Sequence, residues 1–80
     1  MYNVYILRNK YEILYKGLTN NVSRRLKQHN SNKCIGTRGK GPWDLVHVEV
    51  CKDRNEARKL EKYYKSGTGR EILKELLSTN

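Results

Sequence analysis

The chain has 80 residues, with 17 Lys and Arg against 8 Asp and Glu, which gives a formal net charge of +9. We expect one domain over residues 1–80, and a domain of this size leaves little room for a deep pocket, so a polymer substrate suits it better than a small metabolite. The strong positive charge indicates a polyanionic partner such as nucleic acid, although charge alone does not separate an enzyme from a passive binder.

The cysteines and the lack of long apolar runs exclude several further classes of protein. No run approaches the roughly 20 apolar residues of a membrane-spanning helix, and no signal peptide is recognisable. Cys34 and Cys51 make no disulfide framework, and together with His29 and His47 their spacing matches no common zinc site. We therefore expect reduced thiols and a cytoplasmic protein.

The first half of the chain predicts two strands, a helix and a loop. Residues 2–7 are rich in β-forming types and apolar on both faces, which is typical of a central strand, and residues 13–18 follow a polar turn as the hairpin partner. Residues 19–21 supply capping side chains for a helix over about 22–31. The polar stretch 31–42 contains three glycines and is expected to be a loop.

The second half predicts one strand and two helices. Residues 44–50 alternate apolar and polar side chains with period 2, as in a half-buried strand. Residues 53–56 resemble a capping box that opens a helix ending near residue 65, and residues 68–71 repeat the pattern before a last helix. The apolar stripe of that last helix consists of Ile72, Leu73, Leu76 and Leu77.

One carboxylate breaks the apolar pattern of the second predicted helix. Ala57, Leu60 and Tyr64 define the inward face, and Glu61 stands four residues after Ala57 within that stripe. A carboxylate at a core edge is costly unless it is paired or bound to a cation. Two interpretations therefore stay open, a metal ligand or an ion pair with a nearby Arg or Lys. Glu56 lies about 100° from Ala57, which suits a role at the helix start.

In the first predicted helix, basic side chains lie next to the apolar stripe, as the carboxylate does in the second. Val22 and Leu26 mark its inner stripe, and Arg25 and His29 flank that stripe at helical spacing. Arg25 and His29 can therefore line one cleft, whereas Arg24 points nearly the opposite way as a surface charge. The alternative for His29 is an ordinary histidine at a helix end, favoured there by the helix dipole.

Tyr5 and Tyr15 lie on the two strands of the predicted hairpin. If Arg8 pairs with Glu12 across a three-residue turn, the two tyrosines stand opposite each other on one face. Tyrosines at such positions usually fill space, with solvated hydroxyl groups. The chain, however, has 6 Tyr and no Phe, which indicates that the hydroxyl group is needed at some of these positions.

Together these side chains contain the parts for phosphodiester hydrolysis. The carboxylate of Glu61 can hold a divalent cation that polarises the phosphate, and Arg25 can match the charge that develops on the phosphoryl oxygens. A tyrosine hydroxyl can take a proton from the attacking water if its cationic surroundings lower its pKa. With one carboxylate in the group, we expect a single metal ion.

Short motifs around these residues resemble the GIY-YIG endonuclease superfamily along nearly the whole chain. The resemblance is greatest to short stand-alone bacterial members, which are related to the nuclease domain of the excision-repair incision subunit. Val4-Tyr5-Ile6 matches the first signature triplet without its glycine, and Tyr15-Lys16-Gly17 matches the second with Lys in place of Ile or Val. Residues 24–29 and 56–61 are similar to the first-helix and second-helix motifs. The late asparagine of some members has no clear counterpart here.

The resemblance implies an α/β fold, in which three helices flank a small three-stranded antiparallel sheet, and cleavage of DNA that depends on one Mg²⁺ or Mn²⁺ ion. Tyr5 is then the expected general base, with Tyr15 beside the attacking water or the phosphate. Arg25 is expected to stabilise the transition state, His29 to relay a proton or position a group, and Glu61 to hold the metal.

We expect the nucleic acid to be bound mainly through its phosphates, with weak sequence preference. The basic residues expected to contact it are Lys16, Arg24, Lys27, Lys33, Arg38 and Lys40. A shallow site with tyrosines nearby should favour single-stranded or irregular DNA. The alternative is a basic DNA- or RNA-binding module of the same fold with little or no catalysis.

Overall fold

The computed structural model describes residues 1–78 and contains the elements in the predicted order, strand, strand, helix, strand, helix, helix. The strands β1 (Tyr2–Arg8), β2 (Leu14–Thr19) and β3 (Asp44–Cys51) form one antiparallel sheet in the order β2-β1-β3. The central position of β1 follows from its sequence, because four successive side chains from Val4 to Leu7 are buried on alternate faces of the sheet.

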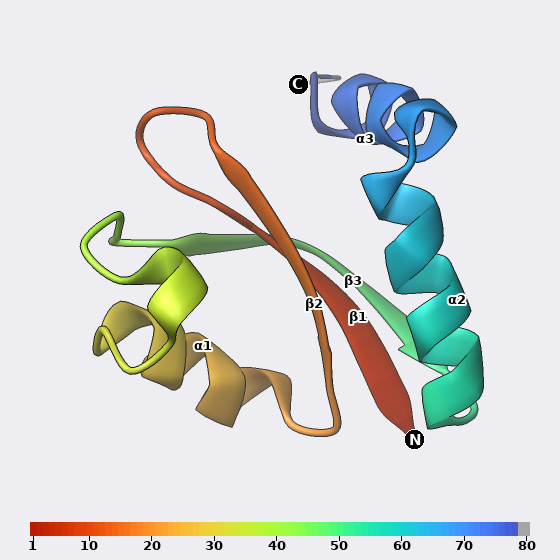
Figure 1. Cartoon of the computed structure of the whole chain (residues 1–80), viewed down its shortest axis with the longest axis horizontal. Coiled ribbons are helices and arrows are strands. Elements are labelled where there is room, and N and C mark those ends of the chain that lie inside the picture. The colour runs from red at the N-terminus through yellow and green to blue at the C-terminus, as the bar shows by residue number, and fades with distance from the viewer. Residues whose placement is uncertain (79–80) are drawn as a thin grey trace.

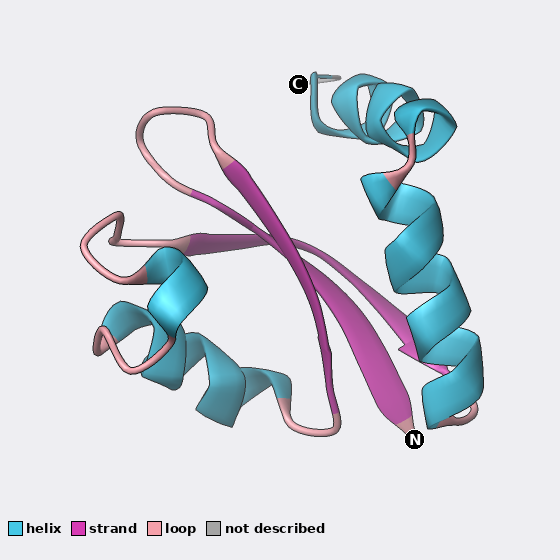
Figure 2. Cartoon of the chain, in the orientation of Figure 1, coloured by secondary structure: helices cyan, strands magenta, loops and turns pink. Residues whose placement is uncertain are grey.

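Helices cover the two faces of the sheet (Figures 1 and 2). The helix α1 (Val22–Asn30) lies on one face, and α2 (Arg54–Lys65) and α3 (Gly67–Ser78) lie on the other. The core on the α1 face consists of Tyr5, Leu7 and Trp43, with Tyr15 and Leu26 packed against them. The core on the opposite face consists of Val4, Ile6, Cys51, Ala57, Tyr64 and Leu73. The expected α/β fold is therefore confirmed.

No helix within residues 1–78 combines the length and the apolar composition that a membrane span requires.

The pairing of the first two strands differs from the one assumed from the sequence. The prediction of a three-residue turn with Tyr5 opposite Tyr15 is wrong, because Tyr5 pairs with Gly17 and Tyr15 pairs with Leu7. The two tyrosines remain on the same face as diagonal neighbours, and their ring centroids lie 6.4 Å apart.

The longer turn is built by the side chain of Asn9, which is buried although it lies in a turn. Its Oδ1 accepts hydrogen bonds from the backbone N–H groups of Tyr11 and Ile13, both at 3.0 Å. Glu12 adopts a positive φ of 63° in this turn. The turn length is therefore set by hydrogen bonds from a side chain to the backbone, which the apolar periodicity does not reveal.

The helix starts follow the predicted capping chemistry in two cases of three. Asn21 accepts from the N–H of Arg24, and Asp53 accepts from the N–H of Glu56. The last helix begins before the predicted cap at Thr68, because Ser66 accepts from the N–H of Gly69 and α3 starts directly after α2. The predicted loop over 31–42 contains one short 3₁₀ helix, η1 (Ile35–Thr37).

The junction between α2 and α3 requires a glycine at position 69. A methyl group on Gly69 would overlap the backbone carbonyl of Tyr63, and a backbone group cannot move aside as a side chain can. We therefore expect Gly69→Ala to lower the free energy of unfolding by about 2–3 kcal/mol, measured by urea denaturation. Gly67→Ala is the matched control, because a methyl group there meets no atom, and it should leave the unfolding midpoint unchanged or raise it. Equal effects of the two substitutions would contradict this account of the junction.

Candidate functional site

A cavity of about 370 Å³ opens at the outer edge of β2, between the helices on the two faces of the sheet. Four of the five predicted catalytic residues line it, namely Tyr5, Tyr15, Arg25 and Glu61. Because β2 is an edge strand, side chains from both faces of the sheet reach this cavity around Gly17 and Leu18. The cavity therefore combines groups from β1, β2, α1 and α2.

His29 is fully buried behind Tyr5 and does not line the cavity, contrary to the expectation that it lines a cleft with Arg25. Its Nε2 lies 2.8 Å from the hydroxyl oxygen of Tyr5, and its Nδ1 lies 2.7 Å from the hydroxyl oxygen of Thr37. The ring is thus held between a strand and the 3₁₀ helix η1. His29 can act on a substrate only through Tyr5.

The hydrogen bonds that Tyr5 and Thr37 form with other groups indicate where the protons lie between Tyr5, His29 and Thr37. Arg25 Nε donates to the Tyr5 oxygen at 3.4 Å, which leaves the Tyr5 proton for His29 Nε2. Thr37 donates to the Cys34 carbonyl at 3.5 Å, which leaves its oxygen to accept from His29 Nδ1–H. This set of contacts favours the Nδ1–H tautomer of His29, with Nε2 as the acceptor that faces Tyr5.

Burial controls the ionisation of both members of the Tyr5–His29 pair. Burial raises the pKa of Tyr5 to about 12, against the smaller opposite effect of the hydrogen bond from Arg25. The condition under which a tyrosine would act as a base, a pKa lowered by its cationic surroundings, is therefore not met at Tyr5, because burial raises the pKa more than Arg25 lowers it. Burial, and next the charge of Arg25, lower the pKa of His29 below 6.5. At neutral pH the pair consists of a protonated phenol and a neutral imidazole.

Gly17 allows the Tyr5 ring to lie against β2. A methyl group at position 17 would overlap the hydroxyl end of the Tyr5 side chain. The glycine of the Tyr15-Lys16-Gly17 triplet therefore has a steric function, because only a residue without Cβ lets the Tyr5 hydroxyl reach both His29 and the cavity.

The guanidinium of Arg25 is oriented by two neutral partners. Its Nη1 donates to Gln28 Oε1 at 3.0 Å, and its Nε donates to Tyr5. Neither partner is a carboxylate, so the positive charge of Arg25 stays available for an anion in the cavity.

Glu61 faces the cavity with its side chain 20% exposed, and its Oε2 lies 3.6 Å from Lys65 Nζ. The ion pair that the sequence left open as an alternative to metal binding is thus present. No group of three His, Cys, Asp or Glu side chains within residues 1–78 could hold a metal ion. The donor set fits Mg²⁺ nonetheless, since this ion is commonly held by one or two carboxylates, waters and phosphate oxygens of the substrate.

The predicted nucleic-acid-binding residues lie at several separate places. Arg24 is exposed as expected, but it does not point away from Arg25, because both line a second cavity beside the first. Lys16 lies on the opposite face of the sheet, where burial, followed by the charges of Arg70 and Lys65, lowers its pKa. The remaining four are exposed on α1 and the following loop and line neither cavity: Lys27, Lys33, Arg38 and Lys40.

Three basic residues at the cavity were missed from the sequence, Arg54, Arg58 and Lys62 on α2. Their spacing of four residues places them on one helical face beside Glu61, and that spacing is the signal that could have found them. Thr37 was missed as well, because no sequence pattern brings it to a histidine eight residues earlier.

Comparison with known proteins gives a consistent result. The model of the GIY-YIG catalytic domain matches residues 1–74. A UPF0213 protein of Clostridium perfringens is 48% identical over 67 residues, which cover 81% of this chain and 71% of that protein. A UPF0213 protein of Photorhabdus laumondii is 42% identical over 59 residues, which cover 72% of this chain and only 57% of that protein.

A solved structure shares the same architecture. The solution NMR structure of a UPF0213 protein from Bacillus halodurans has a TM-score of 0.59 and 37% identity, and the match covers 99% of this chain and 88% of that one. These matches show that the chain belongs to the family of GIY-YIG catalytic domains, whose members are generally nucleases, and the paired tyrosine motifs at the cavity agree with this.

Proposed function

We propose that the protein is a metal-dependent endonuclease that hydrolyses phosphodiester bonds in DNA, with a preference for single-stranded or irregular DNA. The observation that supports this most is the convergence on one cavity of a His-backed tyrosine, an arginine without an acidic partner and a carboxylate. The preference follows from the open, shallow cavity edge and its tyrosines, on which unpaired bases can stack.

Tyr5 and His29 supply a proton relay in this proposal. As the oxygen of a water molecule forms its bond to phosphorus, the Tyr5 oxygen takes the water proton and the Tyr5 proton passes to His29 Nε2, 2.8 Å away. The relay avoids a free phenolate, which the raised pKa of Tyr5 disfavours. His29 ends the step protonated and returns the proton to solvent through Tyr5.

Arg25 and Glu61 act on the phosphate in this proposal. Arg25 lines the cavity, and its guanidinium would bind the phosphoryl oxygens, whose charge grows in the transition state. Glu61 would hold the Mg²⁺ or Mn²⁺ ion, which when bound polarises the phosphate and stabilises the leaving oxygen as the bond from phosphorus to that oxygen breaks. Lys65 must then give up its contact with Glu61.

One observation favours the alternative, a nucleic-acid-binding module of the same fold with little catalysis. The Glu61–Lys65 pair already satisfies the carboxylate without a metal. The two functions are separated by a nicking assay on plasmid DNA with Mg²⁺, with Mn²⁺ and with EDTA.

Glu61→Gln should lower metal-dependent cleavage by about two orders of magnitude or more and leave the fold intact, because the amide cannot replace the carboxylate as a cation ligand. Single-turnover rates in Mg²⁺ measure this, with circular dichroism as the fold control. Lys65→Gln breaks the same ion pair and should retain at least the cleavage of the wild type. Equal losses in the two variants would show that Glu61 acts through its ion pair and holds no metal.

Tyr5→Phe should reduce the single-turnover rate about 100-fold or more, because it removes the hydroxyl that receives the water proton while keeping most of the packing. Tyr64→Phe is the matched control, since Tyr64 is also buried and its hydroxyl donates to Glu49 on the other face of the sheet. The control should cut at the wild-type rate. A fully active Tyr5→Phe protein would transfer the role of base to another group.

The cleavage rate should fall on acidification, with an inflection below pH 6.5, because His29 has a lowered pKa and accepts the relayed proton only while neutral. Below that pKa the neutral fraction of His29, and hence the rate, should drop about tenfold per pH unit. The measurement pairs the pH–rate profile with an NMR titration of the His29 ring. An inflection that does not coincide with the titration of His29 would contradict the relay.

A further inference from the structure

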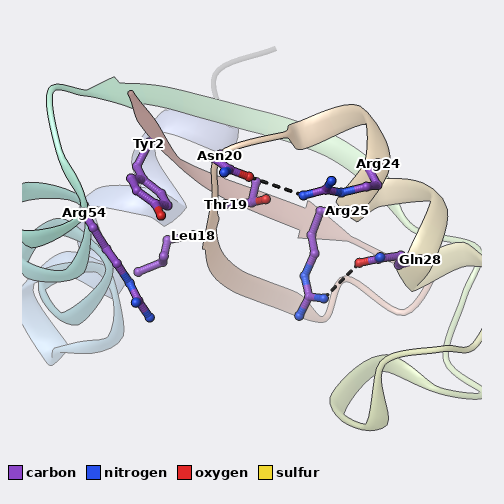
Figure 3. Close-up of a pocket in the computed structure, with 8 residues that line it drawn as sticks. All are labelled: Tyr2, Leu18, Thr19, Asn20, Arg24, Arg25, Gln28 and Arg54. Carbon is purple, nitrogen blue, oxygen red and sulfur yellow. Dashed lines mark hydrogen bonds between the residues drawn. The ribbon is translucent and has the colours of Figure 1, made fainter.

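A second cavity adjoins the candidate active site at the end of β2. Its volume is about 400 Å³, and it shares Leu18, Arg25 and Arg54 with the first cavity, so the two cavities are neighbours along the strand edge. Figure 3 shows Arg25 from α1 and Arg54 from α2 extending in the same direction, whereas Arg24 folds toward Asn20. An extended ligand that spans both cavities would therefore contact Arg25 and Arg54.

Among residues 1–78, arginine is the only charged residue type that lines the second cavity. Arg24 donates to the Asn20 side chain at 3.4 Å and Arg25 to the Gln28 side chain at 3.0 Å, so amide oxygens orient both guanidinium groups without neutralising them. Arg54 forms no ion pair and no side-chain hydrogen bond with any residue in 1–78. This contrasts with Lys65, at the other end of α2, which is paired with Glu61.

The rest of the lining suits a nucleotide unit. Tyr2 and Leu18 contribute an aromatic ring and an aliphatic side chain beside Arg54 (Figure 3). Such surfaces pack against a sugar or a base, and arginines bind the phosphate. The cavity that carries Glu61, by contrast, has one carboxylate among its charged groups.

We propose that the second cavity binds the phosphodiester group next to the one that is cut, and that Arg54 is its principal phosphate ligand. This inference rests on the proposed function for the identity of the neighbouring site. In this arrangement the bound DNA strand runs along the outer edge of β2, from the cavity of Tyr5 and Glu61 toward Arg24 and the N-terminal end of α2. The strand then avoids the basic loop at residues 33–40, where the sequence had suggested contacts.

Arg54→Gln should weaken binding of a short DNA oligonucleotide about tenfold and reduce the slope of log K against log salt by about 1, as expected for the loss of one phosphate contact. Binding is measured by fluorescence anisotropy in the Glu61→Gln background, so that the DNA is not cut. Lys59→Gln is the matched control, because it removes one positive charge from the same helix and Lys59 is exposed and lines neither cavity. The control should change affinity by less than twofold.

A series of oligonucleotides, each with one phosphate replaced by a neutral methylphosphonate, identifies the contact. One position should weaken binding to the protein with Arg54 intact and have no effect on the Arg54→Gln variant. If Arg54→Gln and Lys59→Gln behave alike, or if no position loses its effect in the variant, the inference is wrong. If the inference fails in this way but the wild-type protein still cuts DNA, the proposed function is retained. Binding that depends on Arg54 in a protein that never cuts DNA would instead overturn the proposed function and retain the phosphate site.

Discussion

The hydrogen bond between the Tyr5 hydroxyl and the His29 ring is the interaction on which the candidate site depends. It joins β1 to α1 through the interior, and Thr37 ties the far side of the ring to η1. His29 and Thr37 are fully buried, so losing either bond would leave a polar group unsatisfied at a cost of about 1–3 kcal/mol. The same contacts therefore position the proposed base and hold α1 and the long loop against the sheet.

The sequence was sufficient for the type and order of the elements because the apolar pattern reflects burial directly. A strand that is apolar on both faces has to be central, as β1 is. The pattern does not record bonds from side chains to the backbone. Asn9 was therefore recognised only as a polar turn residue, although its side chain sets the turn length, and Ser66 was not recognised as the cap of α3. Both errors came from local hydrogen bonding that competes with regular structure.

For the candidate site, helical spacing located Arg25 and Glu61 but not His29, which is buried behind Tyr5 instead of lining the cavity. The spacing placed Arg25 and Glu61 beside inward faces, and both line the cavity. Whether the pKa of Tyr5 is lowered could not be decided from the sequence, because the number of cations is visible there whereas the depth of burial is not. The basic residues of α2 were overlooked although their spacing of four residues places them on one helical face. Which of 17 cations face an anion depends on how helices meet the edge of the sheet, and the composition carries no such information.

The edge position of β2 also bears on self-association. An unpaired strand edge is a template for adding a strand from another molecule, which is a common route to aggregation. A strand added to β2 would cover the cavity that depends on this edge being open. Lys16 lies in the middle of β2, and burial, followed by the charges of Arg70 and Lys65, lowers its pKa. A second copy that paired there would bring its own cations close to these three, and like-charge repulsion opposes such pairing.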